Sequence, residues 1–519
     1  MNHAAPHAPR SLSALLDGIV PLPLAHERLL SGLSLDSRRV AAGDLFLACK
    51  GAQRDGRDFI DDAIGRGAVA VLAEADAPLD GATRNGKSLR RDVPIIAVPQ
   101  LPRQMAVVAA RFFALPAQQL RLIGITGTNG KTTRCQLAAR LFTALGRRAG
   151  VIGTLGYGLS GSELCQEDNI PGTTPDAVSL QRQLAELVQA GAAVVVMEVS
   201  SHGLAQHRVV VDDYAAALFT NLTRDHLDLH GTMDAYGACK RQLFTGTGLE
   251  LAVLNWDDAY VRATAALLRK ELRTLTWSLS DRRADLHASE LRFSPAGLML
   301  RVATPWGEFP LHTPLLGAFN ASNLLGVLAL VLGELAGEAD FDPAAVIAAA
   351  ATLPPVPGRM EIVPSEAPLT VVVDYAHTPD ALEQALQALR EHCVGKLWCV
   401  FGCGGERDRG KRPLMAASAE ARADQLVLTD DNPRHETSQQ ILADMLEGLR
   451  FPARAKVQAD RARAIAFAIE NAAPGDAILI AGKGHETYQD SNGVKLPFND
   501  VTEASAVLDR LCRKSGGRA

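Results

Sequence analysis

The most restrictive feature of the sequence is a repeated alternation of apolar runs and polar loops between residues 369 and 486. L-T-V-V-V-D precedes Y-A-H-T-P-D, K-L-W-C-V-F precedes G-C-G-G-E-R-D, Q-L-V-L precedes T-D-D-N-P-R, and A-I-L-I precedes A-G-K-G-H-E. Apolar runs that alternate with helical stretches indicate a parallel sheet that is buried on both faces. Ligands bind at the carboxyl ends of such strands, so we expect the polar loops to converge on one site.

Two proline-bearing stretches divide the chain into segments. They are V-P-Q-L-P-R at residues 98–103 and T-L-P-P-V-P-G-R at residues 352–359, and proline fixes φ and interrupts helices. A chain of 519 residues corresponds to about three domains at roughly 100–200 residues each. We therefore expect an α/β protein with domains at residues 1–105, 106–353 and 354–519.

The composition excludes several classes of protein. The net charge of −5 provides no broad basic surface for nucleic acid, and no apolar run approaches the roughly 20 residues of a membrane helix. The N-terminal M-N-H-A-A-P-H-A-P-R lacks the basic and apolar regions of a signal peptide. None of the eight cysteines forms a C-x-x-C pair, which argues against a zinc knuckle. We expect a cytoplasmic protein with reduced thiols and with no nucleic-acid or membrane partner.

A glycine-rich segment, R-L-I-G-I-T-G-T-N-G-K-T-T, joins an apolar run to a helical stretch. This order of strand, turn and helix is the context that a nucleotide-phosphate loop requires. Lys131 suits the β- and γ-phosphates, and the Thr132 hydroxyl suits Mg²⁺. Ile125 stands where a strict motif has its first glycine, so a plain glycine-rich turn is the alternative. The predicted loop consists of Thr126, Gly127, Thr128, Asn129, Gly130, Lys131, Thr132 and Thr133.

Three further residues are candidates for a metal site. The apolar run A-A-V-V-V-M-E ends in Glu198, which can present a carboxylate to the same Mg²⁺. His226 lies among acids in T-R-D-H-L-D, where a lone histidine is more often structural. Lys240, in A-C-K-R-Q-L-F, by itself has the pattern of a solvated surface lysine. Of the three, only Glu198 is supported by the phosphate loop that precedes it.

An ordered set of motifs resembles one family along nearly the whole chain. T-G-T-N-G-K-T-T, M-E-V-S-S-H-G-L, N-L-T-R-D-H-L-D, G-A-F-N-A-S-N, P-G-R-M-E, D-Y-A-H-T-P-D and A-G-K-G-H-E occur in that order, as in the Mur ligases, which are ATP-dependent amino-acid ligases of cell-wall synthesis. The resemblance implies three domains: a smaller N-terminal α/β domain that binds UDP, a central P-loop ATPase-like domain with a parallel sheet, and a C-terminal Rossmann-like α/β domain. Folylpolyglutamate synthetases share the middle and parts of the last domain.

The resemblance also assigns roles to matching positions. Lys131, Lys240 and His226 would be catalytic, and Lys240 would be carbamoylated. Metal ligands would be Thr132, Glu198, His226 and Lys240, holding two Mg²⁺ ions. The nucleotide would also contact Asn320, Arg359 and Asp374. The UDP-muramyl dipeptide would contact Ser37, Arg38, Thr173, Thr174, Ser200, Gln206 and Arg208.

The loop T-D-D-N-P-R-H-E carries the most specific implication. Within the family, D-N-P-R marks the member that adds meso-2,6-diaminopimelate to UDP-N-acetylmuramoyl-L-alanyl-D-glutamate. Arg434 and Arg407 suit bidentate pairing with the distal carboxylate, and Glu486 suits the distal ammonium. The remaining residues of this expected pocket are Asp431, Asn432, Pro433 and Gly482.

Other functions remain open at this stage. The chain could be another Mur ligase or a folylpolyglutamate synthetase-like enzyme, although D-N-P-R and the N-terminal segment argue against both. A nucleotide-gated binding protein is the alternative from a different class, and it would bind ATP without forming product. The sequence does not determine the oligomeric state, and we take a monomer as the expectation.

Overall fold

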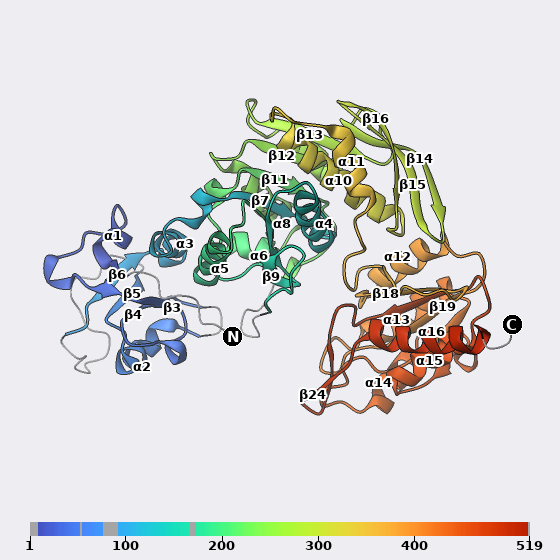
Figure 1. Ribbon diagram of the computed structural model, residues 1–519. Helices are drawn as coiled ribbons and strands as arrows, with labels where there is room; N and C mark the ends of the chain where they lie inside the picture. The colour runs from blue at the N-terminus through green and yellow to red at the C-terminus, as the bar shows by residue number, and fades with distance from the viewer. Residues whose placement is uncertain (1–8, 52–53, 76–91, 167–172, 517–519) are drawn as a thin grey trace. The chain divides into compact units, whose positions relative to one another are not determined.

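The structure is a computed structural model, and it describes residues 9–51, 54–75, 92–166 and 173–516 (Figure 1). The chain forms two compact units. Unit 1 consists of residues 1–276 and 329–339, and unit 2 of residues 277–328 and 340–519. The predicted α/β fold class is confirmed, because parallel sheets alternate with helices in both units. The three predicted domain ranges remain a prediction.

The N-terminal part of unit 1 contains a four-stranded parallel sheet. Its strand order is β3-β4-β5-β6, and every pairing is parallel. Helix α2 (Ile60–Arg66) lies between β4 and β5 in the chain, and α3 (Leu101–Phe112) follows β6. All five residues of β4 are buried, as expected for a strand covered on both faces. The strands are Gly32–Ser34, Asp44–Ala48, Ala70–Ala75 and Ile95–Pro99.

The central sheet of unit 1 positions the phosphate loop. It has the order β12-β11-β7-β10-β8-β9, in which only the edge pair β8–β9 is antiparallel. Helix α4 (Lys131–Ala144) packs against β10 and β8, and α5 (Ala177–Gln189) precedes β10. The strands β7 to β12 are Arg121–Thr126, Ala149–Gly153, Gly156–Leu159, Val194–Glu198, Ala216–Phe219 and Leu251–Asn255.

The C-terminal sheet of unit 2 has the order β17-β18-β22-β19-β20-β21. Alternate residues of its strands face two separate cores. On one face Val372, Cys399 and Leu479 pack with α12, α13 and α14, and on the other Val371 and Ile478 pack with α15 and α16. The strands are Glu361–Ile362, Thr370–Asp374, Leu397–Phe401, Gln425–Leu428, Lys456–Val457 and Ala477–Ala481, and the helices are Pro379–Arg390, Lys411–Arg422, Ser438–Leu446, Arg461–Asn471 and Asp500–Gly516.

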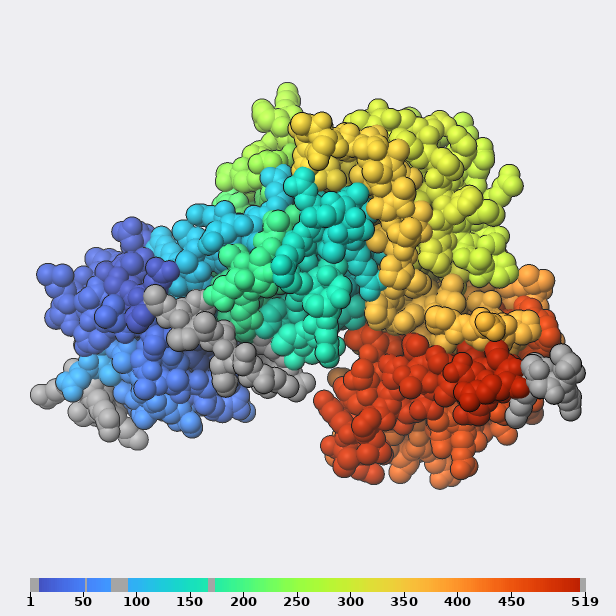
Figure 2. All heavy atoms as spheres, in the orientation of Figure 1, coloured from blue at the N-terminus to red at the C-terminus, as the bar shows by residue number. Residues whose placement is uncertain are grey.

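Two other parts of unit 2 complete it. Strands β14 (Leu286–Ser294), β15 (Gly297–Thr304) and β16 (Gly307–Thr313) form an antiparallel meander. The hairpin of β23 (Tyr488–Ser491) and β24 (Val494–Pro497) follows β22 in the chain. In the space-filling view, the orange and red segments of residues 400–516 form one continuous mass (Figure 2).

Helix α10 (Ala318–Leu335) is more apolar than we expected from the sequence. Within the described residues it is the one helix whose length and mean hydropathy, 1.5 over 18 residues, would suffice to cross a membrane. Its polar residues Asn320, Ser322, Asn323 and Glu334 interrupt the apolar run in the sequence. Because 72% of the helix is buried inside the protein, it has the environment of a core helix.

Candidate active site

The phosphate loop lies between β7 and α4, as predicted. Gly127 has a φ of 138°, and a Cβ atom there would lie 1.8 Å from the Thr220 hydroxyl oxygen, so this position requires glycine. The backbone N–H groups of Thr128 and Asn129 donate to the carbonyl and the side-chain oxygen of Asn221, at 3.0 and 2.9 Å. Gly130, with a φ of 78°, caps the N-terminus of α4, which provides the partial positive charge that attracts phosphate.

Glu198 and Thr132 lie together beneath this loop. The Thr132 hydroxyl donates to Glu198 Oε2 at 2.9 Å, and the backbone N–H of Thr154 donates to Glu198 Oε1 at 2.8 Å. Glu198 is the last residue of β10 and is 2% exposed. Mg²⁺ prefers oxygen ligands of these two kinds, so the hydroxyl and the carboxylate fit one cation. Thr154, in the turn between β8 and β9, was not predicted from the sequence.

Lys131 and Lys240 converge on one carbonyl oxygen. The Nζ atoms of both donate to the oxygen of Gly127, at 2.9 and 2.8 Å. The sequence pattern of Lys240 indicated a solvated lysine, but the side chain is 1% exposed and lies 4.7 Å from the centre of the Tyr236 ring. Burial, together with the charge of Lys131, lowers the pKa of Lys240 to about 6.

His226 belongs to a cluster of aromatic side chains. Its backbone is left-handed, with a φ of 50°, and its ring centre lies 4.7 Å from that of His202 and 6.0 Å from that of Tyr236. Across the residues that the structure describes, no three His, Cys, Asp or Glu side chains are placed to hold a metal ion. The predicted set of Thr132, Glu198, His226 and Lys240 depends instead on a hydroxyl and on a modified lysine, and it remains a prediction.

The residues predicted to bind the muramyl dipeptide lie around the start of α6 (Ser201–Ala205). The Thr174 hydroxyl donates to the Glu198 carbonyl at 3.0 Å and accepts the Ser200 N–H at 2.9 Å. Arg208 donates to the carbonyl of Thr174 at 2.6 Å and to the side-chain oxygen of Gln206. Thr173 lies 3.3 Å from the Thr154 hydroxyl. Thr174 and Thr154 therefore connect this group directly to Glu198.

The N-terminal candidates belong to a short helical turn, η2 (Ser37–Arg39). The guanidinium of Arg38 is exposed and pairs with Asp36 at 2.7 Å. Ser37 is buried, and its hydroxyl lowers the pKa of Asp62 through a hydrogen bond. The structure brings neither residue to the phosphate loop, which is expected if they contact a different part of the substrate.

The nucleotide candidates of unit 2 lie just before β17, at the end of β18 and near the start of α10. Asp374, the last residue of β18, accepts the N–H groups of Met360 and Ala376 at 2.7 and 2.8 Å. Burial raises its pKa. The Arg359 guanidinium stacks 4.7 Å from the centre of the Tyr375 ring. Asn320 donates to the Leu316 carbonyl at 2.9 Å within α10.

The loops after β19, β20 and β22, three of the four that we predicted to converge, lie together in unit 2. Asn432 Nδ2 donates to Glu486 Oε2 at 2.8 Å, although 54 residues separate the two in the sequence. Gly482 has a φ of 117°, and a Cβ atom there would lie 2.5 Å from Asp431 Oδ2. Asp431 is therefore held against the third loop, and burial raises its pKa. Pro433 is buried.

Arg434, from the second of these loops, and Arg407, from the first, both approach Gly404 of the first loop. A Cβ atom on Gly404 would lie 3.0 Å from Arg434 Nη1 and 3.5 Å from Arg407 Cγ. Arg434 has a φ of 51° and donates from Nη1 to the Gly405 carbonyl at 2.8 Å. Its backbone N–H donates to the Asp490 carbonyl at 3.0 Å, so the β23–β24 hairpin fixes its position. Arg407 is exposed.

Buried arginines that we did not predict support the same loops. Arg412, 0% exposed, donates to both carboxylate oxygens of Glu436 at 3.0 Å and to the Gly404 carbonyl at 3.2 Å. Arg461 donates to the carbonyl oxygens of Asp430 and Ala481, at 3.2 and 3.0 Å. No local pattern identifies these residues, because their partners come from distant segments. Glu436 is thus an internal partner and not an open charge of the loop.

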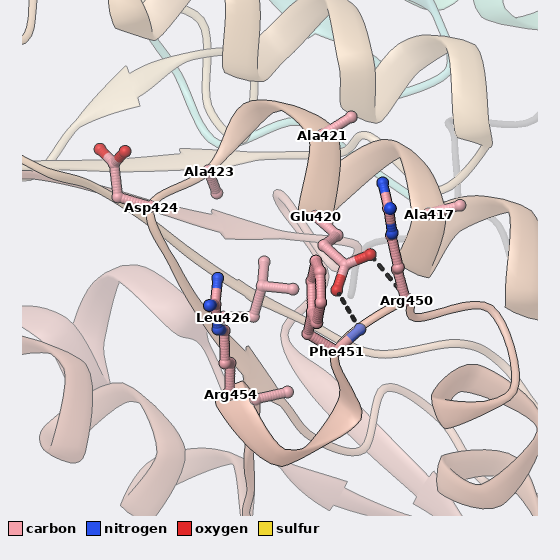
Figure 3. A pocket seen from close by; sticks show the side chains of 10 residues that line it. Ala417, Glu420, Ala421, Ala423, Asp424, Leu426, Arg450, Phe451 and Arg454 are labelled. Atoms are coloured by element: carbon pink, nitrogen blue, oxygen red, sulfur yellow. Dashed lines mark hydrogen bonds between the residues drawn. The ribbon is translucent and has the colours of Figure 1, made fainter.

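A separate pocket of about 390 Å³ lies where β20 begins, at the end of that strand opposite to the loop that carries Asn432 and Arg434 (Figure 3). Its lining includes the alanines Ala417 and Ala421 of α13 together with Leu426, Arg450, Phe451 and Arg454. The Glu420 carboxylate accepts the backbone N–H groups of Arg450 and Phe451 at 2.8 Å. The pocket contains none of the predicted site residues.

Family models match three parts of the chain. The Mur ligase middle domain matches residues 125–331, the glutamate ligase domain of Mur ligases matches residues 358–484, and the Mur ligase family catalytic domain matches residues 29–113. Two curated relatives are named UDP-N-acetylmuramoyl-L-alanyl-D-glutamate--2,6-diaminopimelate ligase. The protein from Chromobacterium violaceum is 49% identical over 91% of this chain and 93% of its own length. The protein from Pseudomonas aeruginosa is 46% identical over 92% of this chain and 95% of its own length.

Solved structures are similar over most of the chain. A structure with the same ligase name has a TM-score of 0.71 and 37% identity, and covers 97% of this chain and all of its own. A folylpolyglutamate synthase from Mycobacterium tuberculosis, complexed with ADP and AMPPCP, has a TM-score of 0.59 at 21% identity. That similarity covers 78% of this chain and 93% of the synthase, and it concerns the fold alone.

Proposed function

The chain belongs to the Mur ligase family, and on that premise we propose that it joins meso-2,6-diaminopimelate to UDP-N-acetylmuramoyl-L-alanyl-D-glutamate with hydrolysis of ATP. The new amide would form at the D-glutamate γ-carboxylate. The observation that carries the proposal is the convergence of Asn432, Glu486, Arg434 and Arg407 on three loops of unit 2. Their amide, carboxylate and guanidinium groups suit a ligand end that bears both an ammonium and a carboxylate.

The first step would transfer a phosphoryl group from ATP. The γ-carboxylate attacks the γ-phosphorus, ADP leaves, and an acyl phosphate forms. Phosphoryl transfer depends mainly on positioning and on neutralisation of charge. At the phosphate loop, Lys131 and the N-terminus of α4 provide positive charge for this neutralisation. Thr132 and Glu198 would hold one Mg²⁺, and His226 and carbamoylated Lys240 a second; bound Mg²⁺ supplies charge neutralisation on the phosphates.

Carbamoylation of Lys240 is part of the proposal. Its amine nitrogen would attack the carbon of CO₂ and lose a proton, which leaves an N-carboxylate. A pKa of about 6 keeps this buried amine largely unprotonated at neutral pH, and only the unprotonated form is nucleophilic. The anionic carbamate would also compensate the charge of Lys131, whose ammonium donates to the same Gly127 oxygen.

We expect ¹³C-bicarbonate to give a carbamate signal in the ¹³C NMR spectrum of the protein. The signal should disappear in Lys240→Met and persist in Lys270→Met, which replaces an exposed lysine. An unlabelled Lys240 in the presence of Mg²⁺ and nucleotide would contradict the expectation. Added acetate that restores activity to Lys240→Ala would support an anionic role for the side chain.

The second step would form the amide bond. One amine of diaminopimelate attacks the acyl carbon, a tetrahedral intermediate forms, and inorganic phosphate leaves as the amine loses a proton. Arg434 and Arg407 would hold the distal carboxylate, and Glu486 the distal ammonium. Asp431, Asn432, Pro433 and Gly482 would shape the pocket. Lysine lacks the distal carboxylate and would leave the guanidinium groups of Arg434, which is partly buried, and Arg407 without a carboxylate partner, which is unfavourable.

The proposal is tested by phosphate release with ATP, Mg²⁺ and the UDP-muramyl dipeptide, with either meso-diaminopimelate or L-lysine as the amine. We expect release with diaminopimelate only, and a loss of at least about 100-fold in Arg434→Ala. Arg454→Ala is the matched control, because Arg454 is an exposed arginine of the separate pocket. Equal use of lysine would remove Arg434 as the selector. No release with either amine would favour a folate-type ligase or a nucleotide-gated binding protein.

The proposal includes a cellular setting. Addition of diaminopimelate to a UDP-linked precursor is a step of peptidoglycan synthesis, and it thereby serves cell-wall biogenesis, cell shape and division. Because both substrates and ATP are small and water-soluble, we propose that the enzyme is cytoplasmic. We also propose that it acts as a monomer. Sedimentation of the protein with and without substrates tests the oligomeric state.

A further inference from the structure

Lys483 lies directly beneath the expected diaminopimelate pocket. Its side chain is 0% exposed, and its ammonium donates to Asn432 Oδ1 at 3.0 Å and to Glu486 Oε2 at 2.9 Å. The same Glu486 oxygen also accepts from Asn432 Nδ2 at 2.8 Å. The backbone N–H of Asp490 donates to Asn432 Oδ1 at 2.9 Å. Lys483, Asn432 and Glu486 therefore form a closed set of hydrogen bonds.

This arrangement changes what Glu486 can offer to a ligand. Its Oε2 atom already has two donors, and no hydrogen bond reaches Oε1 within the part of the chain that the structure describes. The carboxylate also already has a buried counter-charge, and Lys483 and Asn432 lower its pKa against the effect of burial. Glu486 can therefore hold an ammonium through Oε1, but it does not need one for its own charge balance.

The two arginines of the pocket, Arg434 and Arg407, lack the counter-charge that Glu486 has. Among the described residues, Arg434 donates from its side chain only to backbone carbonyl oxygens, those of Gly405 and Asn432. Arg407 has neither a hydrogen bond nor an ion pair there. Neither guanidinium has a carboxylate partner, whereas Arg412 nearby is paired with Glu436 and Asp444. The unmet requirement of the pocket is therefore an anion.

We propose that Lys483 is a specificity-determining residue that acts through Glu486. By pairing with this carboxylate it makes the pocket select its amino acid by the distal carboxylate more strongly than by the distal ammonium. A substrate with only a distal ammonium, such as lysine, brings a third cation to two unpaired arginines and an already compensated Glu486. The inference rests on the proposed function, and it assigns to Lys483 a role in positioning and charge, without contact to the reacting atoms.

The wild-type enzyme provides the first test. Three amines are compared in the ligation assay: meso-diaminopimelate, (2S)-2-aminopimelate, which lacks only the distal ammonium, and L-lysine, which lacks only the distal carboxylate. We expect kcat/KM for aminopimelate to exceed that for lysine by about tenfold or more. Lysine used as well as or better than aminopimelate would overturn the proposal. Product formation with diaminopimelate establishes the proposed function separately, so the two can fail independently.

Variants of Lys483 provide the second test. In Lys483→Gln the hydrogen bonds can remain but the cation is lost, so Glu486 gains a need for an ammonium. We expect the ratio of kcat/KM for lysine to that for aminopimelate to rise about tenfold or more, and Lys483→Arg to keep the wild-type ratio. Lys495→Gln is the control, because Lys495 lies 4.4 Å from the Tyr488 ring, which Lys483 also approaches at 5.6 Å, and Lys495 is exposed.

A purely structural role for Lys483 predicts a different outcome. It would lower kcat/KM for both amines equally and leave their ratio unchanged, and that result would overturn the proposal. The KM for ATP and the thermal unfolding midpoint of each variant report on its fold. If Lys483→Gln does not fold, Lys483→Met, a second variant without the cation, takes its place in the comparison of lysine with aminopimelate.

Discussion

Asp213 shows how a single carboxyl group can make stability depend on pH. It ends the short helix η5 (Val211–Asp213), and burial together with the neighbouring Asp212 raises its pKa to about 6. Between the unfolded pKa of about 4 and the folded pKa, the folded state holds a proton that the unfolded state has released. The contribution of Asp213 to stability is therefore complete at low pH and is lost as the pH rises through 6.

We accordingly expect Asp213→Asn to unfold at a higher temperature than the wild type at pH 7, and this advantage to shrink as the pH falls toward 4. Thermal unfolding at a series of pH values measures the difference. Asp58→Asn, at an exposed position, should follow the wild-type curve. An advantage of Asp213→Asn that is constant with pH would show that the group does not titrate in this range.

At the scale of elements, the pair of Arg461 and Asp500 joins the first residues of α15 and α16. Both side chains are 0% exposed, and two hydrogen bonds of 2.7 Å connect them. Arg461→Met would leave Asp500 buried without a cation, and we expect a loss of about 3–5 kcal/mol in the free energy of unfolding by urea. Arg461→Met combined with Asp500→Leu should recover most of this loss, because no unpaired charge then remains.

An exposed pair serves as the comparison for this prediction. Arg283, 84% exposed, pairs with Asp281 at 2.6 Å, and Arg283→Met should cause no measurable change, because solvent screens such pairs. If the double variant at the buried pair is no more stable than Arg461→Met alone, then the hydrogen bonds from Arg461 to the Asp430 and Ala481 carbonyls dominate its contribution.

The elements also show which parts of the molecule could be predicted from the sequence. The parallel sheet of unit 2 could be predicted, because β19 and β22 are wholly buried and their apolar residues face cores on both sides. The convergence of the loops followed from this topology. Lys483 is one residue from the predicted Gly482, yet its burial depends on Asn432, which is 51 residues away. Long-range partners of this kind leave no local pattern.

Lys240 also shows that a local sequence pattern cannot reveal burial by distant residues. Its local sequence indicates a solvated lysine, and only the resemblance to a family placed it at a metal site. The structure shows why the local pattern misled: the partner that buries the side chain, Gly127, is 113 residues earlier in the chain. Thr154 was missed because a threonine in a turn gives no signal until Glu198 is placed beside it.

For the molecule as a whole, the distribution of cysteines predicts its behaviour toward thiol reagents. All eight cysteines are free, Cys165 is exposed, and Cys135, Cys239, Cys399 and Cys403 are buried. Burial raises the pKa of each of these four thiols, and the thiolate is the reactive form. Dithiobis-nitrobenzoate should therefore label Cys165 rapidly in the native protein, and the buried four only after denaturation.

Cys165→Ser is the informative variant for this prediction, because it should remove the rapid phase and leave the slow ones unchanged. All eight thiols should react in denaturant without prior reduction. Fewer than eight would indicate a disulfide that forms in solution. Rapid labelling of any buried cysteine would indicate that its unit opens frequently.

The arginines beneath the three loops have a consequence for engineering. Arg461 holds the loops through the carbonyl oxygens of Asp430 and Ala481, and Arg412 holds the Gly404 carbonyl. Hydrogen bonds from Arg461 and Arg412 to backbone carbonyl oxygens do not depend on which side chains the loops carry. A library that randomises Arg407, Arg434 and Glu486 would therefore vary recognition on a fixed scaffold, which makes this pocket a starting point for ligases that accept amines other than diaminopimelate.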